Sequence, residues 1–211
     1  MKRLPFGFVL AISAHADDME LACGGTIHRL VRGNADVFMA VFSHCEESLP
    51  EEYRGTDPMA GEVMQSVQEL GMEYGHVLEH LFPVRRFSEH RQDILECLYR
   101  MNEEMSPDLV LVPGGRHQDH QVIREEAFRA FRRSTIWAGE MIGDPAPITK
   151  PGFVALSEAD VQGKVNATGC YVSQRHRPYM APDLIWSWAV LRGRYVDREY
   201  AEMVEVVQQV F

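Results

Sequence analysis

Apolar runs of strand length alternate with segments of helical periodicity along most of the chain. Turn-forming residues bound these runs, as expected for strands buried inside a protein. The expected strands are residues 8–13, 37–42, 77–81, 109–112 and 153–156. The expected helices open after Gly24-Gly25-Thr26 and cover residues 58–70, 88–105, 121–133, 158–168 and 197–209. This alternation predicts a parallel α/β sheet covered on both faces.

Three segments lack a clear period and are predicted to be loops. Residues 134–151 are rich in Gly and Pro, which indicates a long surface loop. Residues 44–57 and 82–90 follow expected strands. Because ligands bind at the carboxyl ends of strands in such folds, we expect these three loops to determine specificity.

The composition is that of a globular enzyme. The chain has 211 residues, 45% of them hydrophobic and 25% charged, which predicts a single domain over residues 1–211. A net charge of −10 argues against nucleic-acid binding, which requires a basic surface. No apolar stretch approaches the roughly 18 residues that span a bilayer. The four cysteines include no Cys-x-x-Cys pair, which fits reduced thiols. We therefore expect a cytoplasmic protein without a membrane span or a nucleic-acid partner.

Two clusters of His and Asp follow two of the expected strands. The first strand is followed by His15, Asp17 and Asp18, and the fourth by a stretch that runs from His117 to His120. Both clusters therefore lie where an α/β active site is expected. Catalytic zinc takes three protein ligands and keeps a fourth position open. The candidate ligands of a Zn²⁺ site are His15, Asp18 and His120.

Metal-assisted hydrolysis of an amide also requires a base and an acid. Asp17 adjoins a candidate ligand yet would point elsewhere, so it is the candidate base. His117 could donate a proton or stabilise an oxyanion, and Asp119 could hold an imidazole in one tautomer. A single His beside acidic residues is more often a solvated loop. Here, however, two such clusters occupy equivalent places on two strand-to-helix turns.

The clusters and the segments after them resemble the LmbE-like (PIG-L) de-N-acetylases. Ala14-His15-Ala16-Asp17-Asp18 with Gly24-Gly25-Thr26 resembles the family's His-Pro-Asp-Asp signature, and His117-Gln118-Asp119-His120 resembles its His-x-Asp-His motif. Later matches, in the family's order, are Lys164, Ala167, Ser173-Gln174, Arg192-Gly193 and Tyr200-Ala201-Glu202. The resemblance extends from residue 8 to near residue 205.

This resemblance implies a Rossmann-like three-layer fold with a mostly parallel sheet flanked by helices. It implies zinc bound by His15, Asp18 and His120, with Asp17 as general base and His117 as acid or oxyanion stabiliser. The implied substrate is an N-acetylated or N-acylated amino sugar, such as N-acetylglucosamine, or its conjugate. Relatives in this family also lead us to expect a homo-oligomer.

Four positions depart from the family's pattern. Ala16 replaces the proline of the signature, and Tyr171 replaces a histidine that often precedes Ser-Gln. Arg116 stands where a small residue is common, so it could reach the substrate or face water. Met59 occupies the expected place of a substrate-binding arginine. These departures affect the predicted substrate more than the predicted chemistry.

Several alternatives remain open. Two His and one carboxylate also suit Fe²⁺ or another divalent transition metal. The substrate could be a non-sugar or thiol-conjugate amide. The domain could also be a non-catalytic metal-binding module, although such a module requires neither Asp17 nor His117. His44 could border the pocket, add a ligand or belong to a solvated loop. The Arg175-His176-Arg177 segment could attract a carboxylate or phosphate, or be exposed.

Overall fold

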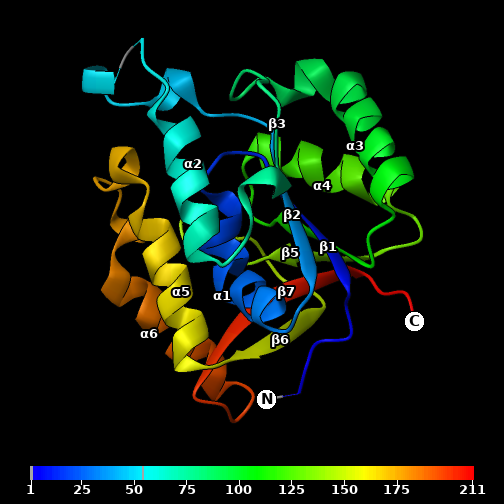
Figure 1. Cartoon of the computed structure of the whole chain (residues 1–211), viewed down its shortest axis with the longest axis vertical. Helices are drawn as coiled ribbons and strands as arrows, with labels where there is room; N and C mark the ends of the chain where they lie inside the picture. Colours follow the sequence, from blue (N-terminus) through cyan, green and yellow to red (C-terminus); the bar gives the residue numbers. More distant parts are fainter. Residues whose placement is uncertain (1, 54) are drawn as a thin grey trace.

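The computed structural model describes residues 2–53 and 55–211, in which seven strands form one mixed sheet (Figure 1). The strands are β1 (Phe8–Ser13), β2 (Asp36–Val41), β3 (Val77–Glu79), β4 (Leu109–Pro113), β5 (Thr135–Gly139), β6 (Pro151–Leu156) and β7 (Tyr200–Gln208). Their order is β3-β2-β1-β4-β5-β7-β6; the first five are parallel, and β7 is antiparallel to both of its neighbours. The strand order reverses between β1 and β4, and in such folds ligands bind at the carboxyl ends of these strands.

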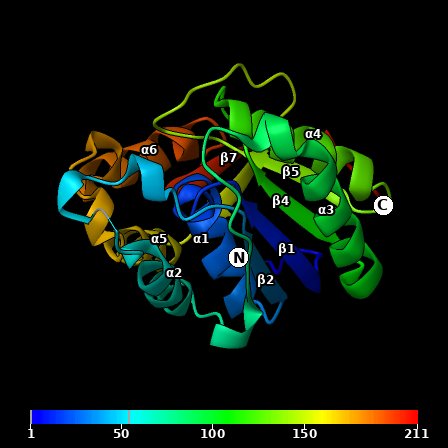
Figure 2. The ribbon, with the colours of Figure 1, turned by 90° about the horizontal axis from the view of Figure 1, so that it is seen from above.

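Helices cover both faces of the sheet. They are α1 (Asp18–Arg32), α2 (Pro58–Glu69), α3 (Arg91–Met105), α4 (Gln118–Ala130), α5 (Glu158–Gly169) and α6 (Pro182–Arg194). Figure 2 shows α3 and α4 on one side, with α1, α2, α5 and α6 on the other. This arrangement confirms the predicted α/β fold with a mostly parallel sheet flanked by helices. Within the described part of the chain, no helix is long and apolar enough to cross a membrane.

Strand β1 shows how the sequence builds the two cores. Its side chains alternate between the faces of the sheet, and every second residue enters the same core. Val9 and Ala11 pack in the core beneath α1 and α2, whereas Leu10 and Ile12 pack in the core beneath α3 and α4. All four are fully buried. The continuous apolar run therefore marks a strand that is covered on both sides.

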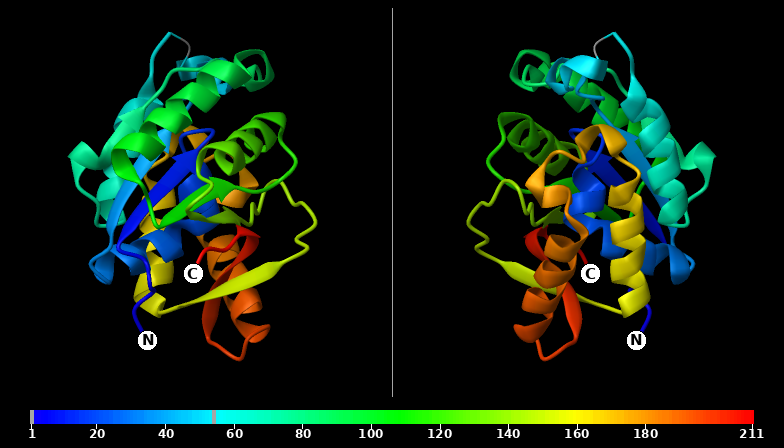
Figure 3. Two further views of the ribbon diagram at one scale, coloured as in Figure 1. Left: turned by 90° about the vertical axis from the view of Figure 1, so that its right-hand side faces the viewer. Right: turned by 90° about the vertical axis from the view of Figure 1, so that its left-hand side faces the viewer.

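Two predictions in the second half of the sequence are wrong. Residues 134–151 were expected to form only a surface loop, but they contain β5 and the first residue of β6. Residues 197–209 were expected to form a helix, but residues 200–208 form β7, which inserts between β5 and β6. Figure 3 shows β6 and β7 lying together at one edge of the sheet, with α6 packed against them.

A buried carboxylate from β7 holds the interior of α1. The backbone of α1 is not helical at Cys23. Beyond this break, the N–H groups of Gly25 and Thr26 donate to Glu202 of β7, at 2.9 and 2.7 Å. Lys164 of α5 lies 2.8 Å from the same carboxylate, and both side chains are buried. The Gly-Gly-Thr, Lys and Glu of the sequence motifs therefore form one buried network.

Asp160 fastens the N-terminus of α5, and its replacement by Asn is expected to destabilise the fold by about 1–2 kcal/mol at pH 7. It completes a capping box with Ser157, and its carboxylate also pairs with His28 at 3.0 Å. Burial alone would raise the pKa of Asp160, but the hydrogen bonds from His28 and Ser157 lower it from 3.8 to about 2. Because the folded-state pKa lies below the unfolded value, this stabilisation is full above about pH 4 and is lost as the pH falls towards 2.

Urea unfolding at pH 7 and at pH 3 measures this effect. The difference in unfolding free energy between the native chain and Asp160→Asn should shrink at pH 3. Glu158→Gln is the matched control, because Glu158 is exposed in the same first turn of α5. An Asp160→Asn effect that does not change with pH would contradict the assignment.

Candidate active site

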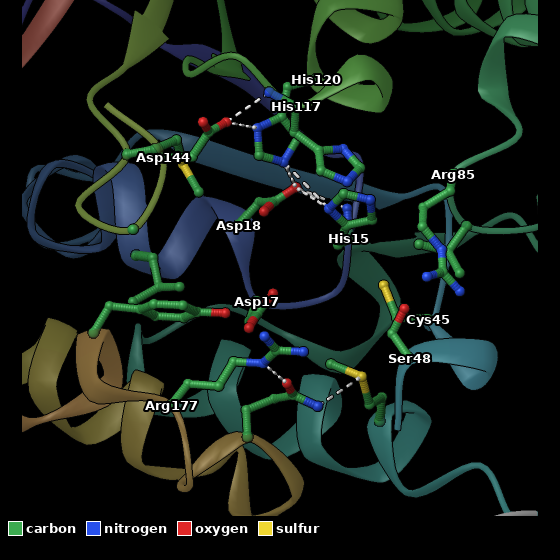
Figure 4. Close-up of a pocket in the computed structure, with 17 residues that line it drawn as sticks. His15, Asp17, Asp18, Cys45, Ser48, Arg85, His117, His120, Asp144 and Arg177 are labelled. Carbon is green, nitrogen blue, oxygen red and sulfur yellow. Dashed lines mark hydrogen bonds and ion pairs between the residues drawn. The ribbon is translucent and has the colours of Figure 1, made fainter. Parts of the chain in front are cut away.

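The two predicted clusters lie side by side at the carboxyl ends of β1 and β4 (Figure 4). His15, Asp17 and Asp18 form the turn between β1 and α1, which is closed by a 3.1 Å hydrogen bond from the Asp18 N–H to the His15 carbonyl. His117 caps the N-terminus of α4, and His120 lies in the first turn of that helix. Because β1 and β4 are adjacent and parallel, both turns open onto the same cavity, whose volume is about 280 Å³.

Three acceptor atoms face one another at this point. The Nδ1 of His15, the Oδ2 of Asp18 and the Nε2 of His120 are 3.2 to 3.3 Å apart in every pair. The outer ring nitrogens are engaged elsewhere: His15 Nε2 contacts Asp119 Oδ2 at 3.1 Å, and His120 Nδ1 contacts the Gly114 carbonyl at 2.9 Å. With a cation bound, these outer contacts would hold the imidazole protons, and the three inner atoms would all present lone pairs.

The geometry of this acceptor triangle fits a small divalent cation. With metal–ligand bonds of about 2.0–2.2 Å, two ligands of a tetrahedral site are about 3.4 Å apart. Burial alone would raise the pKa of Asp18, but the imidazoles of His120 and His15 lower it well below its usual range. Asp18 therefore contributes a carboxylate. Burial alone would lower the pKa of His15 and His120, but the Asp18 carboxylate raises both, so the cluster attracts positive charge.

His117 lies beside the triangle. Its nitrogen and those of His15 and His120 lie within 4.8 Å of one another, so three histidines could also hold a metal. Asp18 is closer to the other two, at 3.2 and 3.3 Å. The Nδ1 of His117 accepts the Asp119 N–H at 3.2 Å, which places the ring proton on Nε2. Burial, together with the two neighbouring imidazoles, lowers the pKa of His117, which favours the neutral ring.

Asp17 lines the cavity without belonging to the acceptor triangle. Figure 4 shows its carboxylate below Asp18, next to the guanidinium of Arg177. The residue is only 8% exposed. Burial and the neighbouring Asp18 carboxylate raise the pKa of Asp17 to about 6. The site therefore contains an acid–base group that is free of ligand contacts.

Two aspartates hold the two clusters in place. Asp119, which was predicted from the sequence, is fully buried and contacts His15 through Oδ2. Asp144, which the sequence reasoning missed, accepts the N–H groups of Arg116 and His117 at 2.6 and 2.7 Å. It comes from the segment between β5 and β6 that was interpreted only as a surface loop. The one sequence signal for this contact was Gly115, because glycine readily adopts the φ of +89° that brings the turn against Asp144.

The turn that carries Ala16 is braced from behind. The hydroxyl of Tyr171 lies 2.5 Å from the Ala16 carbonyl and 2.7 Å from Glu20 Oε1. A hydroxyl carries one proton, so Tyr171 can donate to only one of these two oxygens at a time. Burial raises the pKa of Glu20 to about 7. The two departures from the family pattern at positions 16 and 171 are thus in direct contact.

Of the residues with weaker sequence signals, some line the cavity and others lie outside it. His44 does not line the main cavity; it lies between Asp57 and Glu79, at 2.7 and 3.0 Å. Arg116 also lies outside the lining. Of the two arginines in the Arg-His-Arg segment, Arg175 is exposed and bonds the Gly169 carbonyl, whereas Arg177 lines the cavity. Met59 lines it too.

Comparisons with known proteins place this geometry in context. Residues 10–131 match the family model of PIG-L, described as GlcNAc-PI de-N-acetylase. No curated protein matches the chain by sequence. Similar solved structures include the zinc-inhibited form of teicoplanin deacetylase, with 14% identity, a TM-score of 0.75 and coverage of 93% of this chain and 96% of that chain.

Two further structures show the range of proteins with this fold. N,N'-diacetylchitobiose deacetylase from Pyrococcus horikoshii has 18% identity and a TM-score of 0.71, covering 95% of this chain and 83% of that chain. GalB, the 4-carboxy-2-hydroxymuconate hydratase from Pseudomonas putida, has 18% identity and a TM-score of 0.76, covering 97% of each chain. At these identities the likeness shows the fold alone.

Proposed function

The chain belongs to the PIG-L (LmbE-like) family, and on this premise we propose that it is a metal-dependent hydrolase that deacylates the nitrogen of an N-acylated amino sugar or its conjugate. The observation that carries the proposal is the triangle of three buried acceptor atoms with Asp17 and His117 beside it. A purely structural metal site needs neither an unligated carboxylate nor a neutral imidazole facing the same cavity. Their presence therefore supports catalysis over a non-catalytic metal-binding module.

His15, Asp18 and His120 would hold the metal, which we propose to be Zn²⁺. A divalent metal in such a site lowers the pKa of water and polarises the carbonyl of an amide. The Oδ2 of Asp119 fixes the ring of His15, and the Gly114 carbonyl fixes the ring of His120. With the metal bound, these outer contacts would hold the ring protons and leave the inner nitrogens directed at the cation.

Asp17 and His117 would move the protons. Asp17 takes a proton from the attacking water, because its carboxylate faces the cavity and is not committed to the acceptor triangle. The Nε2–H of His117 donates to the oxygen that gains charge or to the leaving amine. His117 is oriented for this by the Asp119 N–H, which occupies its other nitrogen.

Removal of the metal is expected to abolish amine release, and added Zn²⁺ to restore it. The assay measures amine release from a panel of N-acetylated sugars by metal-stripped protein, with and without Zn²⁺ or Fe²⁺. His120→Ala should lose metal occupancy, because it deletes one vertex of the acceptor triangle. His90→Ala is the matched control: His90 is half-buried in the short helix before α3, where it pairs with Asp93 and packs on Phe82.

Each outcome of this assay is informative. Zinc-restored release supports the hydrolase and ranks its substrates. Metal bound stoichiometrically by His120→Ala would show that the proposed ligand set is wrong. Absence of release from every sugar, with metal bound, would favour a non-sugar amide or a pocket that does not catalyse.

A further inference from the structure

The cavity contains two guanidinium groups that the proposed hydrolysis does not use. Arg177 lies in the turn between the short helices Val172–Gln174 and Pro178–Met180, and Arg85 lies between β3 and α3. Both line the cavity. Figure 4 shows Arg177 reaching towards Asp17 from below and Arg85 standing on the opposite side, near Cys45. The chain has a net charge of −10, so two arginines at one cavity indicate binding of a negatively charged group.

A chain of buried contacts fixes the position of Arg177. The N–H and the hydroxyl of Ser173 donate to the buried Glu62 of α2, at 2.9 and 2.6 Å. The next residue, buried Gln174, accepts the Nε–H of Arg177 at 2.9 Å through Oε1. With Nε held, the terminal amino groups remain to face the cavity. Within residues 2–53 and 55–211, no ion pair joins Arg177 to a carboxylate.

The backbone at Arg85 is held in a strained conformation. Its φ is +67°, in the left-handed region that non-glycine residues rarely adopt. The Asp119 carboxylate accepts the Arg85 N–H at 2.6 Å, and the Gln118 side chain donates to the Arg85 carbonyl at 2.6 Å. Among the described residues, its guanidinium pairs with the exposed Glu47 at 3.8 Å, and such surface pairs are weak. Arg85 is therefore anchored at the site with its charge available.

In residues 2–53 and 55–211, no carboxylate that lines the cavity forms a close ion pair with either arginine. Asp144 is committed to two backbone N–H groups, and Asp18 to the acceptor triangle. Within the described residues, Asp17 forms no ion pair with Arg177 within 4.0 Å. A guanidinium that is partly removed from water binds carboxylates and phosphates through two parallel N–H bonds.

We propose that Arg177, with Arg85 as a second cation at the rim, binds an acid group of the substrate, either a carboxylate or a phosphate. This inference rests on the proposed function, because it specifies the class of N-acylated sugar as anionic. Arg177 is close to the proposed base Asp17, so the acid group lies near the amide in the bound substrate. Neutral N-acetylated sugars would then be poorer substrates than their anionic counterparts.

Titration calorimetry of the zinc-loaded protein tests the inference without relying on turnover. The probes are glucose 6-phosphate, glucose 1-phosphate and glucuronate, with glucose as the neutral reference; none has a cleavable amide. At least one anionic probe should bind about tenfold more tightly than glucose or better, as two charge-assisted hydrogen bonds predict. Arg177→Met should remove most of that preference, and Arg177→Lys should retain part of it. Exposed Arg175→Met is the matched control and should retain all of it.

The outcomes separate the inference from the proposed function. Equal binding of glucose and all three anions, or binding of none, overturns the inference. A preference that survives in Arg177→Met also overturns it, because the metal would then be binding the anion. Amine release is assayed in parallel. Arg177-dependent anion binding without amine release would retain the acid site and reject the deacylase, and the reverse result would do the opposite.

Discussion

Asp17→Asn is expected to lower the turnover of amide hydrolysis by about 10²–10⁴-fold while leaving the metal bound. The change preserves the shape of the side chain but removes its ability to accept a proton. The three atoms of the acceptor triangle belong to other residues, so metal occupancy should stay unchanged. The Michaelis constant should change much less than turnover, because the proton moves only in the chemical step.

The measurement combines steady-state kinetics with metal analysis of the same preparation. Asp93→Asn is the matched control, because Asp93 is an exposed carboxylate on α3 whose ion-pair contact is to His90. Undiminished turnover would remove Asp17 from the mechanism. Lost turnover together with lost metal would instead show that Asp17 helps to hold the ligand cluster.

Glu202→Gln is expected to destabilise the protein by about 3–5 kcal/mol, the cost of breaking a buried ion pair on one side. The change leaves Lys164 buried without its counter-ion. It also turns an amide donor towards groups that donate already, namely the N–H groups of Gly25 and Thr26 and the Thr26 hydroxyl. Urea unfolding of both proteins measures the difference.

The double variant Glu202→Gln with Lys164→Met separates charge from shape. Removal of the stranded ammonium should recover part of the lost stability, because the unpaired charge is then absent. A double variant that is less stable than Glu202→Gln alone would show that Lys164 contributes mainly through packing of its methylene chain against α1.

The strands that could be predicted are those buried on both faces. Residues 8–13 and 109–112 are continuous apolar runs, and such runs occur where helices cover both sides of a sheet. Strand β7 has a different pattern. Two of its buried positions are glutamates, Glu202 and Glu205, which pair with Lys164 and Arg124. Glutamate favours helices, and two glutamates three positions apart match helical spacing, so the segment suggested a helix.

The sequence predicted those parts of the site that directly follow strands. The His and Asp clusters come directly after β1 and β4, and parallel strands bring their carboxyl ends together. Asp144 and Arg177 lie in irregular segments whose paths depend on tertiary contacts, and neither local period nor spacing predicts where such segments return to the sheet. For Arg177, the sequence predicted only that its segment either is exposed or binds an anion.

The insertion of β7 between β5 and β6 has a consequence for how the sheet is completed during synthesis. Strand β1 is made first, and each of strands β2 to β5 pairs with a strand that precedes it in the sequence. These five strands can therefore pair as each leaves the ribosome. Strand β6 joins the sheet only through β7, which is translated after α5 and α6. It must therefore wait, unpaired, for a partner made later. Strand β7 also carries Glu202 to Lys164, so the buried ammonium gains its counter-ion in this closing step.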